Sequence, residues 1–169
     1  MDCKLVRLLW IEMTSGGSDG EFDRLYEFGV QVYDNLFRLC PWLQHFFPTL
    51  ATVPPGKDPR AVAMFRKQAL RLVSVVDTAV KYCDRLDEID HRLRELGRRH
   101  RAYVNGKLKA DHFKLMEDAV VAVVWDYVEK QKRGGQYVGQ CGDQLVRAAD
   151  ALTAFAKYIV DQIIIGYAG

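Results

Sequence analysis

Apolar residues in this chain recur at three- and four-residue steps, and this helical period limits the possible folds more than any other feature. The clearest stripe lies between about residues 60 and 85 and contains Phe65, Gln68, Ala69, Leu72, Val75, Val76, Ala79 and Cys83. Such spacing places side chains on one face of an α-helix. No stretch alternates apolar and polar residues as a half-buried strand does. The pattern therefore predicts an all-α protein.

The same period predicts several further helices, separated by segments rich in glycine, proline or small polar residues. We expect helices at about residues 5–13, 21–39, 60–85, 90–101, 110–131 and 143–166. A short helical turn should follow Pro41, because proline suits the first helical position. The expected loops are residues 14–20, 53–59, 103–109 and 133–142. Since no linker or internal repeat divides the chain, we expect one domain over residues 1–169.

Composition and charge exclude several classes of protein. The chain has 169 residues, of which 49% are hydrophobic and 27% charged, as in an ordinary globular protein. The formal net charge of +2 is too small to predict a nucleic-acid partner. No apolar run is long enough for an integral membrane segment, and the start of the chain does not resemble a secretory signal. We therefore expect a cytoplasmic protein.

The cysteines do not form a recognisable site. No CxxC pair occurs, so the spacing does not predict zinc binding. A disulfide framework is not expected in a chain of this length without an export signal. We expect reduced thiols, while redox activity or lipidation of one of them stays open: Cys3, Cys40, Cys83 and Cys141.

Two polar residues stand out against the apolar pattern. Gln68 lies within the stripe, where an amide costs free energy unless it forms a useful hydrogen bond. His100 closes a later helical segment. Alone it would fit an ordinary surface histidine favoured by the helix C-terminus, and we expect His45, His91 and His112 to lie in solvated or rim positions. A histidine and a distal polar group on two facing helices, however, are what a buried, axially ligated haem requires.

The chain resembles the animal globins in four segments that follow the order of that family. Residues 28–47 contain a glycine, a leucine-phenylalanine pair, a proline that opens a helix and a final phenylalanine. Residues 65–77 resemble the globin E helix, residues 96–102 the F helix with its proximal histidine, and residues 113–125 the G helix. The neuroglobin branch is especially similar. The resemblance implies a single-domain globin fold, with helices packed around a pocket for haem b (iron protoporphyrin IX).

The resemblance also implies the site residues. His100 corresponds to the proximal ligand of the haem iron, and Gln68 to the distal residue, which is histidine in most vertebrate globins. Tyr33 corresponds to the residue that faces a bound ligand. The remaining matches are haem contacts, among which the arginine is expected to reach a propionate: Phe47, Arg71, Leu72, Leu96, Phe113 and Met116.

Tyr33 and Gln68 bring two hydrogen-bond donors to this expected pocket. Bound dioxygen carries partial negative charge, and a hydrogen bond to a charged acceptor contributes roughly 1.5–3 kcal/mol. Two such donors would slow dioxygen release by roughly two to three orders of magnitude. We therefore expect high-affinity binding of dioxygen, and of other diatomic gases, for sensing, storage or scavenging. Because an amide ligates iron poorly, we also expect a five-coordinate ferrous form.

Two other functions remain open at this point. The same pocket fits a haem-based redox protein that performs nitric oxide dioxygenation, nitrite reduction, superoxide production or electron transfer. No flavin or nicotinamide motif occurs, so a partner reductase would supply the electrons. The third hypothesis is a haem-free, globin-like regulatory module. Apolar residues near the C-terminus fit either a homodimer contact or a buried helix end: Ile164, Ile165 and Tyr167.

Overall fold

The computed structural model describes residues 2–15, 21–47, 63–103, 107–135 and 140–169, and within these ranges its regular elements are all helical. The elements are α1 (Cys3–Thr14), α2 (Glu21–Leu39), the short 3-10 helix η1 (Pro41–Phe46), α4 (Ala63–Lys81), α5 (Leu86–Tyr103), α6 (Ala110–Arg133) and α7 (Gln140–Ala168). The all-α prediction is confirmed. The predicted loop at 53–59 lies outside the described residues, as do parts of the other three.

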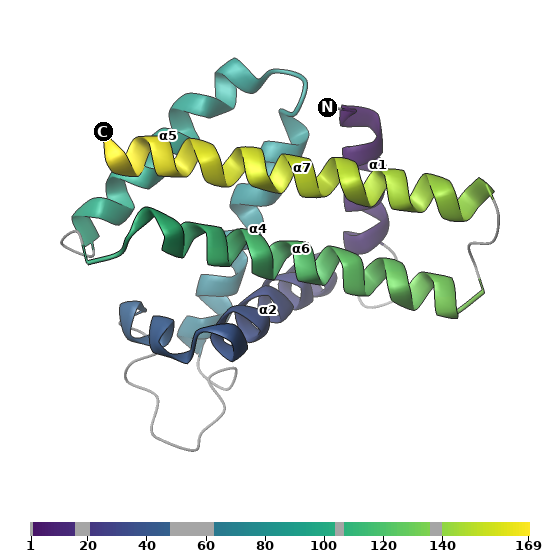
Figure 1. Ribbon diagram of the computed structural model, residues 1–169, viewed down its shortest axis with the longest axis horizontal. Helices are drawn as coiled ribbons and strands as arrows, with labels where there is room; N and C mark the ends of the chain where they lie inside the picture. Colours follow the sequence, from purple (N-terminus) through teal and green to yellow (C-terminus); the bar gives the residue numbers. More distant parts are fainter. Residues whose placement is uncertain (1, 16–20, 48–62, 104–106, 136–139) are drawn as a thin grey trace.

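Helices α6 and α7 run side by side, and the remaining helices are arranged around this pair (Figure 1). Helix α5 packs on α7, and α1 crosses α7 closer to its start. Helix α2 packs against both α6 and α4. Although α4 and α5 follow each other in the chain, few contacts join them directly in the described part of the structure. None of the described helices is both long and apolar enough to cross a membrane.

The core is formed by the apolar stripes that the sequence shows. Phe65 of α4 and Phe155 of α7 are its largest fully buried side chains. The indole ring of Trp10 packs edge-on against Phe28 with 5.1 Å between ring centroids, and its Nε1 donates to Asp77 Oδ1 at 3.1 Å. Burial of side chains of this size contributes about 1.5–3 kcal/mol each, which makes the crossing of α1 over the other helices a stable part of the fold.

Glycines allow two pairs of helices to approach closely. A Cβ atom on Gly29 of α2 would lie 2.7 Å from the carbonyl oxygen of Ala69 in α4. A Cβ atom on Gly97 of α5 would lie 2.0 Å from the carbonyl oxygen of Ile163 in α7. In the same crossing, a Cβ atom on Gly166 would meet the backbone of α5. The backbones of α5 and α7 therefore touch without side chains between them.

Several predicted helix ends are wrong. Helix α5 begins at Leu86 rather than near residue 90, and Asp87 and Glu88 in its first turn interact favourably with the helix N-terminus. Helix α4 ends at Lys81 rather than near residue 85, and α7 begins within the predicted loop 133–142. Thr14 was expected in a loop. It instead ends α1, is buried, and its hydroxyl donates to the carbonyl oxygen of Trp10 at 2.7 Å.

Candidate functional site

Tyr33 of α2 and Gln68 of α4 meet where these two helices pack together. Gly29, one helical turn before Tyr33, lets the backbones approach. The amide Nε2 of Gln68 donates a hydrogen bond to the Tyr33 hydroxyl at 3.0 Å. Tyr33 is only 2% exposed, and Gln68 is half-buried. The structure thus brings the two residues together and couples them by a hydrogen bond that uses one of the two amide hydrogens of Gln68.

Three phenylalanine rings surround the ring of Tyr33. Phe37 stacks on it with 5.5 Å between centroids, and Phe47 and Phe65 meet it edge-on at 5.4 and 5.9 Å. Phe47 also contacts Phe37 at 5.5 Å, so the residue after η1 is tied to α2. The roles of Phe37 and Phe65 beside Tyr33 were not predicted. The spacing of Phe37, four residues after Tyr33 on the same helix, was the available signal.

This apolar environment determines the protonation state of Tyr33. Burial raises the pKa of its hydroxyl to about 12, although the hydrogen bond from Gln68 and the charge of Arg71 act in the opposite direction. The hydroxyl is therefore protonated throughout the neutral range. Because Gln68 donates to its oxygen, the O–H hydrogen of Tyr33 remains available for another acceptor. A donor that is itself hydrogen-bonded in this way is polarised and becomes a stronger donor.

His100 lies in the last turn of α5 and is half-buried. Its Nδ1 lies 2.9 Å from the carbonyl oxygen of Leu96, one turn earlier. A carbonyl only accepts, so Nδ1 carries the hydrogen and Nε2 presents a lone pair. Within the described residues Nε2 has no hydrogen-bond partner. The ring of Phe113 from α6 packs edge-on against the imidazole at 5.6 Å. Nε2 can therefore serve as a metal ligand.

Polar contacts with α7 hold α5 in place. The hydroxyl of Tyr158 donates to a carboxylate oxygen of Asp90. Arg94 Nε donates to Gln162 Oε1 at 2.8 Å, and Arg94 also forms an ion pair with Asp90 at 3.5 Å. Gln162 is one of the few buried polar side chains. Together with the contact at Gly97, this network fixes the helix that carries His100. This network was not predicted. The available signal in the sequence was Gly97, because a glycine inside a helix often marks a close approach.

The residues at the end of α7, which were expected either in a homodimer contact or in a buried helix end, differ in burial. Tyr167 is buried, and its hydroxyl donates to the carbonyl oxygen of Leu108 at 2.5 Å. Its ring lies 5.0 Å from that of Phe113, which in turn contacts His100. Ile165, in contrast, is 50% exposed. The end of α7 is thus partly a buried support for the His100 side of the site.

The other expected contact residues lie on the same helices but are only partly covered. Leu72 of α4, Leu96 of α5 and Met116 of α6 are half-buried, and Arg71 is exposed. Helix α4 packs mainly on α2, and α5 on α7. Gln68 and His100 therefore lie on two helices that scarcely touch and that carry incompletely buried apolar side chains. This arrangement fits a flat apolar group with one axial ligand, which is the character of haem.

The remaining histidines do not assemble a metal site. Among the described residues, no three side chains of the His, Cys, Asp or Glu type gather as metal ligands would. His45 and His91 are exposed, as expected. His112 is half-buried against the ring of Trp42 at 4.8 Å, and its Nδ1 accepts from the backbone N–H of Lys109, which fits a rim position. A single imidazole, that of His100, is thus left as the candidate ligand.

Comparisons with known proteins agree with the fold. The globin family model matches residues 30–161. Among 39 significantly similar solved chains is one described as a hexacoordinated heme protein from an anhydrobiotic tardigrade, in a crystal structure at pH 4. It is 20% identical, with a TM-score of 0.68, and the alignment covers 100% of this chain and 96% of that one. No curated protein sequence matches significantly. Because the family model spans most of its length, the chain belongs to the globin family.

Proposed function

We propose that this globin binds haem b between α4 and α5, where Nε2 of His100 would hold the iron. The hydrogen bond from Nδ1 to Leu96 supports this role, because it orients the ring and fixes the tautomer with a free Nε2. The contacts of Asp90 and Arg94 with α7 restrict movement of the helix that carries the ligand. A haem iron held by one imidazole offers its sixth position to a diatomic gas.

We further propose that the gas is dioxygen and that binding is reversible. The observation that carries this proposal is the hydrogen bond of 3.0 Å from Gln68 Nε2 to the buried Tyr33 hydroxyl. It leaves the hydroxyl hydrogen of Tyr33 free to donate to a ligand on the distal side. The raised pKa of Tyr33 keeps that hydrogen in place at neutral pH. Hydrogen bonding to the negative charge that develops on bound dioxygen stabilises the bound state over the empty one.

The contact between the two residues lowers the affinity gain expected from the sequence. We propose that Tyr33 and Gln68 act as a relay in which one amide hydrogen of Gln68 polarises Tyr33, so that the Tyr33 hydroxyl serves as the one strong donor to the ligand. One charge-assisted hydrogen bond contributes roughly 1.5–3 kcal/mol, which slows release by about 10- to 100-fold. Release this slow favours sensing or scavenging over bulk transport.

The coordination state follows from the same residues. Gln68 occupies the distal position, and an amide is a poorer iron ligand than imidazole. His112 is held by the backbone of Lys109. We therefore propose a five-coordinate ferrous form, in contrast to the tardigrade protein whose description names a hexacoordinated heme.

Absorption spectra of the purified protein test the proposal in its ferric, dithionite-reduced and dioxygen-exposed states. We expect a broad five-coordinate reduced spectrum that converts to a stable dioxygen complex. A sharp low-spin reduced spectrum would show that a protein side chain closes the sixth position. The absence of a Soret band after addition of haem would refute haem binding itself. His100→Ala is the matched variant, and it should lose the axial ligand while keeping the helical fold.

A further inference from the structure

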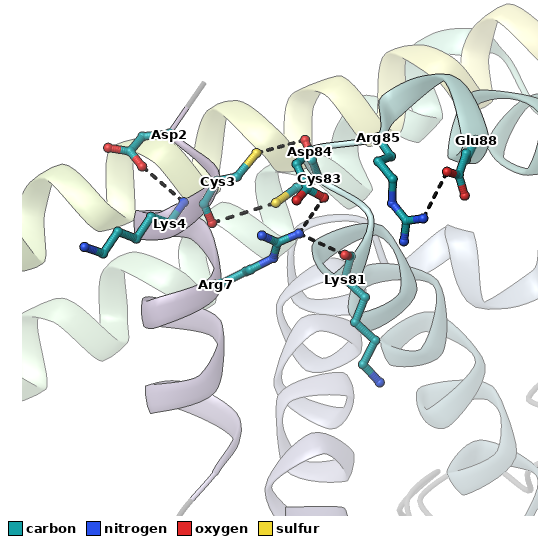
Figure 2. A network of polar contacts seen from close by, with 9 residues as sticks. All are labelled: Asp2, Cys3, Lys4, Arg7, Lys81, Cys83, Asp84, Arg85 and Glu88. Atoms are coloured by element: carbon teal, nitrogen blue, oxygen red, sulfur yellow. Dashed lines mark hydrogen bonds and ion pairs between the residues drawn. The ribbon is translucent and has the colours of Figure 1, made fainter.

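Cys3 and Cys83 lie against each other although 80 residues separate them in the sequence (Figure 2). The thiol of Cys3 donates to the backbone carbonyl of Cys83, with 2.8 Å between sulfur and oxygen. The sulfur of Cys83 makes the reciprocal, longer contact of 3.8 Å with the carbonyl of Cys3. Each sulfur therefore lies beside the backbone of the other cysteine, and both are free thiols.

Contacts of nearby residues hold the two cysteines close to each other, independently of the contacts that their sulfur atoms make. Arg7 donates to the carbonyl oxygen of Lys81 at 3.0 Å and to Asp84 Oδ1 at 2.6 Å (Figure 2). Trp10 Nε1 donates to the carboxylate of Asp77, which lies one turn before Lys81 on α4. Cys3, Arg7 and Trp10 follow the spacing of one helix face. This face of α1 is thus fixed on the end of α4 and on the turn that leads to α5.

We propose that Cys3 and Cys83 form a disulfide when the protein meets a peroxide, and that this bond latches α1 to the turn between α4 and α5. Cys3 is half-buried and reachable, whereas Cys83 is 2% exposed. Burial is the main cause that raises the pKa of Cys83 to about 12, so Cys3 is the thiol that reacts first. Cys83 then acts as the resolving thiol.

The reaction balances in two steps. The Cys3 thiol releases its proton, the thiolate attacks hydrogen peroxide, and the O–O bond breaks. The products are Cys3 sulfenic acid and hydroxide, which takes up the released proton to become water. The sulfur of Cys83 then attacks the sulfur of Cys3, and the hydroxyl group leaves as water with the proton of Cys83. In total, two thiols and one hydrogen peroxide give one disulfide and two waters. The two electrons that reduce the peroxide come from the sulfurs.

The other two cysteines provide a contrast within the same chain. Cys40 is half-buried at the end of α2, and Cys141 is exposed near the start of α7. In the described part of the structure, neither of them forms a hydrogen bond with another cysteine. Peroxide should therefore link only the pair Cys3 and Cys83. The new bond closes a loop of 80 residues, which removes conformational entropy from the unfolded chain and should raise the Tm by roughly 10 °C.

Peptide mapping and thermal unfolding test the latch in the variant Cys40→Ser/Cys141→Ser, without reference to haem. After treatment with hydrogen peroxide and alkylation, we expect a linked peptide pair containing Cys3 and Cys83, a mass lower by two hydrogen atoms, and a raised Tm. A dithiol reductant should reverse all three. The additional substitution Cys3→Ser, which leaves Cys83 alone, should abolish them.

Three results would overturn the proposal: both thiols still alkylated after peroxide, Cys3 oxidised alone to the sulfinic acid, or Cys3 joined to a second molecule. If the double-serine variant does not fold, the natural chain answers the same question, because the mapped peptides identify which cysteines are linked. Since neither readout depends on a bound gas, a failure of the latch is distinguishable from a failure of the proposed function.

Discussion

The substitution Tyr33→Phe tests the distal relay most directly. It removes the hydroxyl while keeping the ring that packs against Phe37, Phe47 and Phe65. The loss of the hydrogen bond with Gln68 should cost about 1 kcal/mol of folding free energy, so the variant should fold. We expect its main effect to be on the release of dioxygen.

The size of the effect follows from the structure. Tyr33 is buried and protonated, so its donated hydrogen bond is not weakened by competition with water. Loss of one hydrogen bond to a charged acceptor costs roughly 1.5–3 kcal/mol, and each 1.4 kcal/mol is a factor of about ten. We therefore expect Tyr33→Phe to release dioxygen about 10 to 100 times faster than the natural chain.

Stopped-flow displacement of dioxygen by carbon monoxide measures this rate. The matched control is Tyr26→Phe on the same helix, whose ring lies under the guanidinium of Arg66, whereas the hydrogen bond of Gln68 goes to Tyr33. The relay also predicts that the effects of Tyr33→Phe and Gln68→Leu on the dioxygen release rate do not multiply in the double variant. The reason is that Gln68 acts through the Tyr33 hydroxyl. A Tyr33→Phe rate within about threefold of the natural chain would refute the donor role, given the energies above. Multiplicative effects would refute the relay.

Three further perturbations test other parts of the structure. His100→Gly should lose the Soret band of bound haem and regain it with added imidazole, whereas a lack of rescue would argue against axial ligation. Gly97→Ala should lower the free energy of unfolding in urea by about 2–4 kcal/mol, because the new Cβ would lie 2.0 Å from the carbonyl oxygen of Ile163. Gly134→Ala, with its nearest contact at 3.4 Å, is the control and should change stability far less. The pKa of Tyr33 rises from 10.0 to about 12 on folding, so its contribution to stability is intact below pH 10 and is lost as the pH rises toward 12. Tyr33→Phe should therefore show an alkaline loss of stability that is smaller by about 3 kcal/mol in pH-dependent urea unfolding, and identical pH profiles would contradict the burial of this hydroxyl.

The helical period predicted the fold because the spacing of apolar residues is a local property of the sequence. Its errors lie at the helix ends, where capping and tertiary contacts compete with the apolar pattern. Thr14 looked like a loop residue by composition, yet burial and a hydrogen bond to Trp10 keep it in α1. Residues 86–89 do not continue an apolar stripe, because two of them are acidic. Asp87 and Glu88 nevertheless stabilise the start of α5, since negative charge is favourable at a helix N-terminus.

The residues of the candidate site come from the resemblance and stay predictions, whereas the contacts between them could not be predicted from the sequence. The resemblance identified Tyr33, Gln68 and His100, whereas the hydrogen bond that couples the first two depends on how closely α2 and α4 approach at Gly29. Nothing local in the sequence indicated the pairing of Cys3 with its partner, since 80 residues separate them. Membership of the neuroglobin branch stays a prediction.

The contact of α5 with α7 at Gly97 has a mechanical consequence for the proximal histidine. Two backbones in contact cannot approach further, so α5 has no room to shift toward α7 at this crossing, where Gly97 and Arg94 both meet the backbone of α7. At a rise of 1.5 Å per residue, His100 lies about 4.5 Å from Gly97 along the helix axis and Leu86 about 16 Å. The imidazole therefore lies about one helical turn from the most tightly packed point of α5, so the rigidity of that crossing extends to the proximal histidine more than to the start of the helix.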